Sequence, residues 1–355
     1  MKILIDIGHP AHVHLFKHFA WGMQKKGHEV LFTTRDKEMA ITLLKCYKFA
    51  YVSFGKPFKS KQGKIWGLLK FDWLLFKISL KYRPDIFISH GSIYAAQVAW
   101  LSRRPHIALE DTGNMEQIRL YLPFTKAVLT STAFQKKLGK KQIYYNGYHE
   151  LAYLHPKYFV PNSDIFGILG IEEESKFVIV RFVSWQASHD YKQIGIDLES
   201  KKRLVTELAK HARVFISSEA ELPLEFSRYQ IKIPPEKIHD ALAFATMFIG
   251  EGATMASECA MLGTPAIYVN SITAGTLDEQ EKYGLIFGFR SPKGFIEKSL
   301  ELLTLPNLKE EFQKRKNKML SEKIDVTSFL LWFVENYPKS LSEAKENPDL
   351  GLKFE

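Results

Sequence analysis

The stretch of residues 250–269 constrains the fold of this chain more than any other. It reads GEGATMASECAMLGTPAIYV, and an apolar run of strand length, residues 246–249, comes directly before it. Two glycines permit a tight turn, Thr254 is a good N-cap for a helix over residues 255–262, and a following glycine and proline would end that helix. The pattern predicts a strand, a glycine-rich turn, a short helix and a second strand.

The start of this helix is suited to binding a phosphate. A helix N-terminus presents unpaired amide groups and a partial positive charge, and glycine lets a ligand approach the backbone closely. Glu258 lies four residues after Thr254, so its carboxylate would accept hydrogen bonds from sugar hydroxyls beside a bound diphosphate. A glycine-rich turn of any α/β protein, with Glu258 as a favourable acid in the first turn, explains the same residues equally well.

The motif resembles the nucleotide-sugar signature of glycosyltransferases with the GT-B fold. It is similar to a stretch of the N-acetylglucosaminyltransferase that makes lipid II and of the UDP-N-acetylglucosamine 2-epimerases. In those families the turn amides contact the diphosphate and a helix glutamate binds the ribose. The resemblance implies phosphate contacts at Gly252, Ala253, Thr254 and Met255, and a ribose contact at Glu258.

Three segments together resemble a prokaryotic family of unknown function, domain-of-unknown-function family 354, which is placed with GT-B proteins. They are residues 1–14 (MKILIDIGHPAHVH), 180–185 (VRFVSW) and 250–258 (GEGATMASE). The resemblance extends over roughly residues 1–320 and implies an α/β, GT-B-like fold, with two Rossmann-like domains whose parallel sheets face a central cleft. It implies no particular reaction.

Residues 1–146 are predicted to form the first, acceptor-side domain. An apolar strand at residues 2–7 is followed by the loop 8–12 and by a helix over residues 13–26, and this unit repeats along the chain. Open parallel sheets bind ligands at the carboxyl ends of their strands, so the loop 8–12 is a candidate site.

Histidines crowd this loop, at positions 9, 12 and 14. In related GT-B enzymes a histidine here faces the acceptor or contacts the donor. Imidazole is the natural proton acceptor near neutral pH, so we expect His12 to act as catalytic base, with His9 as the second choice. No pattern of acids or cysteines accompanies the histidines, so the sequence predicts no metal site. Histidines that only cap or pack the helix are the alternative.

Two later turns resemble those of the 2-epimerases that carry catalytic acids. They are residues 90–92 (HGS) and 110–113 (EDTG). Glu110 matches the acid of the second turn, and we expect it to be catalytic, with a solvated loop acid as the alternative. Ser92 stands where the first turn would have its aspartate, which weakens an epimerase assignment.

The second domain is predicted to bind the nucleotide sugar. Its first strand ends at Arg181, and Trp185 and His189 follow. In GT-B enzymes the corresponding loop faces the nucleotide. By that resemblance, Arg181 would neutralise the diphosphate, Trp185 would stack on the base or sugar, and His189 would match a functional histidine of the epimerases.

The domain boundaries follow from these assignments. Residues 147–163 are the predicted linker, residues 164–324 are the nucleotide-sugar domain, and residues 325–355 are a helix that packs back on the first domain plus a polar tail.

The net charge of +10 favours anionic partners, such as a nucleotide sugar or an acidic membrane surface. Nucleic acid is not a predicted partner, because no nucleic-acid-binding motif is present. Lysines at positions 56, 59, 61 and 64 precede an aromatic helix predicted over residues 65–82. A helix buried on the sheet and a helix lying on an anionic membrane both fit this pattern.

Two cysteines, Cys46 and Cys259, provide neither a disulfide framework nor a metal spacing. The N-terminus enters a strand that contains Asp6, unlike a signal peptide, and no apolar run approaches the roughly 20 residues that span a bilayer. We therefore expect a cytoplasmic protein, with at most a peripheral contact with the inner face of the membrane.

The predicted function is that of a glycosyltransferase in cell-surface polysaccharide or glycolipid synthesis. It would take a nucleotide sugar, with UDP as the expected nucleotide, as substrate and transfer the sugar to a polysaccharide or lipid-linked acceptor. No cofactor is expected. Two alternatives stay open: an isomerase like UDP-N-acetylglucosamine 2-epimerase, and a non-catalytic nucleotide-sugar-binding protein. No residue identifies the sugar, the acceptor or the stereochemical outcome.

Overall fold

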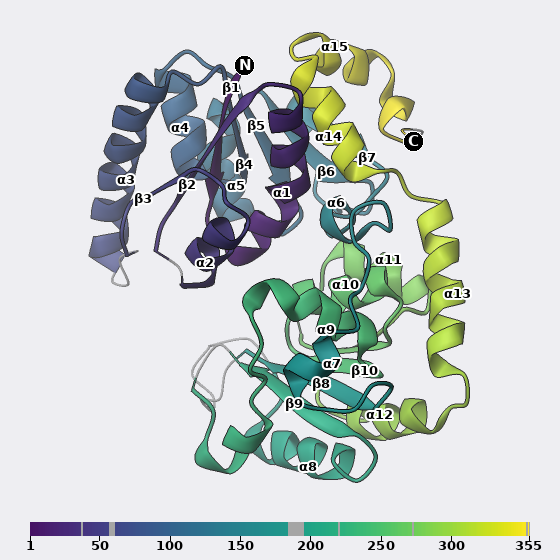
Figure 1. Ribbon diagram of the computed structural model, residues 1–355. Helices are drawn as coiled ribbons and strands as arrows, with labels where there is room; N and C mark the ends of the chain where they lie inside the picture. Colours follow the sequence, from purple (N-terminus) through teal and green to yellow (C-terminus); the bar gives the residue numbers. More distant parts are fainter. Residues whose placement is uncertain are drawn as a thin grey trace. The chain divides into compact units, whose positions relative to one another are not determined.

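The computed structural model divides into two compact units (Figure 1). The first unit is Met1–Tyr158 with Lys323–Glu355, and the second is Phe159–Glu322. Residues 147–158, which the sequence suggested as linker, lie within the first unit. The structure describes residues 1–36, 38–56, 61–183, 195–218, 221–271, 273–352 and 354, with side chains not described at 38 and 61–65.

The first unit is built on a parallel sheet with the strand order β3-β2-β1-β4-β5-β6-β7. Chain order reverses between β1 and β4, which pair with each other. Such a reversal is where open α/β sheets bind ligands, outside the carboxyl ends of the strands. The strands are β1 (Lys2–Ile7), β2 (Glu29–Thr34), β3 (Tyr51–Ser53), β4 (Ile86–His90), β5 (His106–Glu110), β6 (Ala127–Ser131) and β7 (Gln142–Tyr145).

Helices cover both faces of this sheet, with α3 and α4 on one side and α1 on the other (Figure 1). Helix α14 packs on α1 and α6. The helices are α1 (Pro10–Lys25), α2 (Glu38–Cys46), α3 (Lys61–Tyr82), α4 (Ile93–Leu101), α5 (Met115–Tyr121), α6 (Leu151–Leu154), α14 (Val326–Glu335) and α15 (Lys339–Glu346), with 3₁₀ turns η1 (Leu122–Phe124), η2 (Gly139–Lys141) and η5 (Pro348–Leu352).

Two helix predictions need correction. Helix α1 begins at Pro10 and not at residue 13, because His9 serves as its N-cap and proline suits the first helical turn. The C-terminal residues are not merely a polar tail: they form α15 and η5, and the Gly351 carbonyl accepts a 2.7 Å hydrogen bond from the Asn146 amide.

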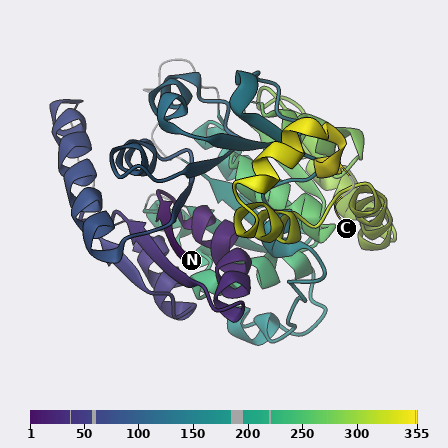
Figure 2. The same cartoon turned by 90° about the horizontal axis from the view of Figure 1, so that it is seen from above.

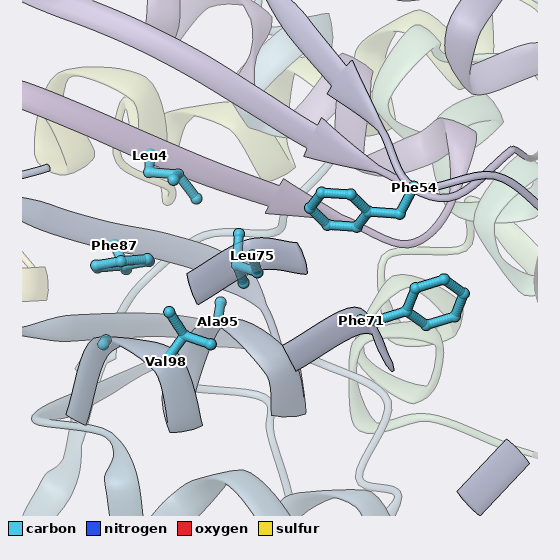
Figure 3. Close-up of a cluster of buried hydrophobic side chains, with 8 residues drawn as sticks. Leu4, Phe54, Phe71, Leu75, Phe87, Ala95 and Val98 are labelled. Carbon is cyan, nitrogen blue, oxygen red and sulfur yellow. The ribbon is translucent and has the colours of Figure 1, made fainter. Parts of the chain in front are cut away.

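One core cluster shows why the strands of the first unit read as continuous apolar runs. Leu4 of β1 and Phe87 of β4 meet Phe71 and Leu75 of α3 and Val98 of α4 (Figure 3). All are buried. Burying each large side chain contributes about 1.5–3 kcal/mol, so this face of the sheet is held firmly. Figure 2 shows α3 along the outer edge of the first unit.

The second unit repeats the design around a smaller parallel sheet with the order β12-β11-β10-β8-β9. Here the chain order reverses between β8 and β10. The strands are β8 (Phe177–Phe182), β9 (Arg213–Ser218), β10 (Met247–Gly250), β11 (Ala266–Val269) and β12 (Ile286–Phe289). The predicted α/β class is therefore confirmed in both units.

Helices again connect the strands of the second unit. They are α7 (Ile165–Leu169), α8 (Leu198–Leu208), α9 (Ile238–Phe244), α10 (Ala253–Leu262), α11 (Gly275–Lys282), α12 (Phe295–Thr304) and α13 (Leu308–Ser321), with 3₁₀ turns η3 (Leu224–Tyr229) and η4 (Pro235–Lys237). In neither unit do the described residues include a helix with the length and apolarity needed to cross a membrane.

Candidate functional site

The glycine-rich turn of the second unit places the start of α10 at the carboxyl end of β10. The helix begins at Ala253, and Gly252 is its N-cap, with no side chain capping it. The prediction of Thr254 as N-cap is wrong, because the flexible turn lets the helix begin two residues earlier. The amides of the first turn have no partner inside the helix and face outward from its positive end. Gly263 ends the helix in the left-handed conformation at φ 70°, as predicted.

Arg181 lies beside this helix start. A Cβ added at Gly250 would meet the Arg181 carbonyl oxygen at 2.7 Å and the Arg181 Cβ at 2.8 Å, so β8 and β10 approach closely here. A Cβ at Gly252 would lie 3.5 Å from the Arg181 Cγ. The Arg181 guanidinium donates a 2.8 Å hydrogen bond to the Ser217 hydroxyl. The fold therefore brings the predicted phosphate-binding arginine and the helix amides together.

Glu258 is buried one turn further along α10. Its Oε1 lies 3.0 Å from the Nε2 of His239, a buried residue of α9. This interaction fixes α9 against α10. The predicted ribose contact at Glu258 thus involves a carboxylate already engaged with His239, a residue that the sequence analysis did not single out.

Glu251, inside the glycine-rich turn, is a further residue that the sequence analysis missed. Its carboxylate accepts backbone hydrogen bonds from Ile196 at 2.8 Å and Val183 at 3.1 Å, and it lies 3.4 Å from the Lys201 ammonium. Burial lowers the pKa of Lys201, and the Glu251 charge opposes that shift. The segment between these two amides contains the predicted sites Trp185 and His189, which lie outside the described residues.

The first two histidines of the loop after β1, His9 and His12, make different contacts. His9 caps α1, because its Nδ1 accepts a 3.2 Å hydrogen bond from the Ala11 amide. The Nδ1 of His12 accepts from the Gly8 amide at 3.2 Å, and its ring stacks on that of His90 with the centroids 4.4 Å apart. Burial and the neighbouring His90 hold the pKa of His12 well below its usual range, so His12 is neutral.

His90 belongs to a cluster that sequence analysis did not predict. The Asp111 carboxylate lies 2.8 Å from the His90 Nε2 and 3.1 Å from the His149 Nδ1. Burial favours neutral His90, but the Asp111 charge and hydrogen bond outweigh it and raise the pKa of His90 to about 9. Burial also opposes ionisation of Asp111, yet His149 and His90 hold the pKa of Asp111 well below its usual range. The cluster therefore holds an ion pair beside neutral His12.

Glu110, the predicted catalytic acid, is buried and directly precedes Asp111 in the chain. Its Oε1 accepts hydrogen bonds from the Thr112 amide and hydroxyl, at 2.8 and 2.6 Å, and from the Gly113 amide at 3.2 Å. Its Oε2 accepts from the Tyr121 hydroxyl at 2.7 Å. These bonds shape the turn after β5, and the adjacent Asp111 is the acid that lies against the histidines.

The turn at Ser92 has a buried acid nearby in space. Ser92 caps α4 and donates a 2.5 Å hydrogen bond to the carboxylate of Asp6, from β1. The Arg35 guanidinium binds both oxygens of Asp6, at 3.0 and 2.8 Å. Asp6 is thus a neutralised structural acid rather than a poised base.

Comparisons with known proteins identify the family to which the chain belongs. A profile of the family described as "Protein of unknown function (DUF354)" matches residues 1–287. An uncharacterized protein of Methanocaldococcus jannaschii is 25% identical over 281 residues, which cover 75% of this chain and 81% of the relative.

Solved structures share the fold at low sequence identity. The UDP-GlcNAc 2-epimerase of Neisseria meningitidis, solved with UDP-GlcNAc, has TM-score 0.65 and 14% identity, covering 88% of this chain and 94% of its own. S. aureus MnaA, solved with UDP, has TM-score 0.69 and 12% identity over 97% of both chains. The Streptomyces glycosyltransferase SsfS6 has TM-score 0.60 and 11% identity, over 95% and 100%. The chain therefore has the GT-B fold of these proteins.

The close approach at the turn yields a stability prediction. Gly250→Ala will lower the free energy of unfolding by about 1–3 kcal/mol, because the new methyl group meets the Arg181 backbone. Gly167→Ala in α7 is the matched control: a Cβ there meets nothing within 4 Å, so the variant will equal or exceed the wild type. Urea unfolding measures both. Equal midpoints for Gly250→Ala and the wild type would refute the close approach.

Proposed function

We propose that this chain, which belongs to the DUF354 family of proteins of unknown function, is a glycosyltransferase that uses a UDP-sugar. The observation that carries the proposal is the Arg181 side chain beside the α10 start, where no side chain caps the helix. A guanidinium and helix amides are the groups that bind a diphosphate without a metal. Two proteins of the same fold, from N. meningitidis and S. aureus, were solved with UDP-GlcNAc and with UDP.

The reaction would use a different group in each unit. In the first unit, neutral His12 would take the proton of the acceptor hydroxyl on Nδ1, which would release the Gly8 amide, while that oxygen bonds to the anomeric carbon of the sugar. The bond from the anomeric carbon to the diphosphate breaks, and its electron pair leaves with UDP. In the second unit, Arg181 and the amides of Ala253, Thr254 and Met255 stabilise the charge that develops on UDP.

An epimerase is the second candidate, because proteins named as UDP-GlcNAc 2-epimerases have the same fold, at TM-scores of 0.65 and 0.66. Abstraction of the sugar C2 proton needs a free base. The acid nearest Ser92 is Asp6, and Arg35 neutralises it. The transferase therefore stays first. A non-catalytic binder remains the third alternative, which binding without turnover would support.

Binding of UDP tests the donor site. Arg181→Ala will lower the UDP affinity at least about 10-fold, because a charge-assisted contact contributes about 1.5–3 kcal/mol. Arg203→Ala removes the same charge from an exposed position of the second unit and serves as control. Calorimetry on the three proteins gives the affinities. A UDP affinity that is the same in Arg181→Ala and Arg203→Ala would remove Arg181 from the site.

The function of Glu258 is tested in the same titration. Glu258→Ala and His239→Gln both disturb the contact between α9 and α10, but only the first removes the carboxylate. We expect Glu258→Ala to bind UDP more weakly than His239→Gln does. Equal losses would mean that Glu258 acts only by positioning α9.

Incubation with UDP-N-acetylglucosamine in deuterated water, without acceptor, separates transferase from epimerase. Epimerisation through C2 proton abstraction incorporates deuterium at C2, whereas a transferase leaves C2 protonated. We expect no C2 deuteration by mass spectrometry, since Asp6 is neutralised by Arg35. Steady C2 deuteration would make the epimerase the leading assignment.

An anionic membrane surface is the proposed docking partner of the first unit. Helix α3 buries Phe71 and Leu75, yet Trp66 and Trp73 are 64% and 56% exposed on its outer side. The Lys77 ammonium lies over the Trp73 ring at 5.0 Å. Aromatic side chains interleaved with lysines are typical of helices that lie on anionic bilayers. The buried face fits the first of the two sequence alternatives, and we propose the second for the exposed face. Of the lysines named from sequence, Lys59 lies outside the described residues, and the side chains at 61 and 64 are not described.

Flotation with vesicles tests this face. The protein will float with anionic vesicles and not with zwitterionic ones, and high salt will release it, because each lysine contributes about 1 kcal/mol within a Debye length of about 8 Å. Trp66→Ser/Trp73→Ser will abolish flotation. Leu224→Ser removes an apolar side chain that is 91% exposed in the second unit and will float normally. Unchanged flotation of the double variant would exclude α3 as the docking face.

A further inference from the structure

We propose that His90, Asp111 and His149 form a binding site for a divalent transition-metal ion, with Zn²⁺ as the first choice. One ligand atom from each residue lies within 4.8 Å of the other two. Two imidazoles and one carboxylate are a ligand set for Zn²⁺ and for other first-row metals that keep open coordination positions. The inference does not depend on the proposed transferase activity.

Two of the three ligands stand at the ends of paired strands, and the third lies in a connecting segment of the same unit. His90 is the last residue of β4, Asp111 follows β5 directly, and His149 lies in the segment between β7 and α6. Strands β4 and β5 pair in register, with His90 opposite Leu109. Ligands on the ends of buried strands keep their geometry better than ligands on loop tips. His90 and Asp111 are therefore held by the sheet itself.

Unpaired buried polar atoms surround the cluster. His149 is 7% exposed, and its Nε2 has no hydrogen-bond partner among the described residues. The hydroxyl of Tyr145, whose ring stacks on His149 with the centroids 6.3 Å apart, also lacks a partner there. A buried polar atom without a partner costs about 1–3 kcal/mol, and an ion or a bound water is its usual explanation. One of these two atoms belongs to a proposed ligand ring, although the nitrogen that faces Asp111 is Nδ1.

Aromatic contacts hold the ligand rings in place. The His12 ring stacks on His90 at a centroid distance of 4.4 Å, and the rings of His90 and His149 meet edge to face at 5.2 Å. These contacts limit the rotation of both rings. Separations of 2.8 and 3.1 Å from Asp111 to the two rings must open slightly to admit an ion that binds each ligand at about 2.0–2.2 Å.

The number of ligands indicates what kind of site this is. Structural zinc sites have four protein ligands, whereas three leave a position for a water or a substrate oxygen. The charge also suits such a ligand: one carboxylate leaves a divalent ion with a net charge of +1. The exogenous ligand would be an oxygen of a hydroxyl, carboxylate or phosphate group.

No metal site was predicted from the sequence, because no pattern of acids or cysteines accompanies the histidines of the first loop. The proposed ligand cluster includes neither His9 nor His12. The proposed set combines residues that follow three different strands and are far apart in the chain, so no local spacing in the sequence indicates it.

Calorimetric titration of Zn²⁺ into the chelator-treated full-length protein tests the proposal. We expect one equivalent to bind, with an affinity at least 100-fold lower in Asp111→Asn and in His149→Gln. His211→Gln, which removes an exposed histidine of the second unit, is the matched control and will bind like the wild type. No binding by the wild type, or binding by both cluster variants with the wild-type affinity, would overturn the site.

A second measurement uses only the wild type, so it does not depend on the folding of a variant. Crystals soaked in Zn²⁺ and measured at the zinc absorption edge will show an anomalous peak about 2.0–2.2 Å from a nitrogen of His90, a nitrogen of His149 and an oxygen of Asp111. Anomalous peaks only at surface residues would overturn the proposal. UDP titrations report on the second unit, so their failure would leave this result unaffected.

Discussion

In each unit the order of the parallel strands reverses once, between β1 and β4 in the first and between β8 and β10 in the second. This constraint decides where chemistry can occur, because only at a reversal do the carboxyl ends of two neighbouring strands send their connections to opposite faces. Several of the candidate groups described above lie at these reversals. The loop with His12 leaves β1, His90 ends β4, Arg181 lies in β8, and the turn before α10 leaves β10.

At the second reversal, backbone packing and ligand chemistry depend on the same residues. Gly250 lets β10 approach Arg181, and Gly252 begins α10 with its amides outward. The buried Glu251 then ties two backbone amides and Lys201 to the turn. A side chain at Gly250 would disturb the position of the arginine relative to the helix. The turn thus permits the close packing of β10 against β8 and is also the proposed diphosphate site.

Local signals explain what the sequence could predict. The alternation of apolar runs and helical periodicity predicted both parallel sheets, and the glycine at 263 correctly predicted the end of α10. The N-cap at Thr254 was wrong because two glycines make several helix starts compatible with the sequence. The partners missed were distant in the chain: His239 lies 19 residues from Glu258, and His90 lies 21 residues from Asp111. Such pairs are created by strand order, which no local pattern contains.

The central claim is that the start of α10 binds the diphosphate of a nucleotide. NMR-detected hydrogen exchange at Ala253, Thr254 and Met255, with and without UDP, tests it most directly. UDP will slow exchange at these amides, while exchange at the start of α8, which Asp197 already caps by accepting from the Ser200 amide, will stay unchanged. Equal exchange at the α10 amides with and without saturating UDP would contradict the account.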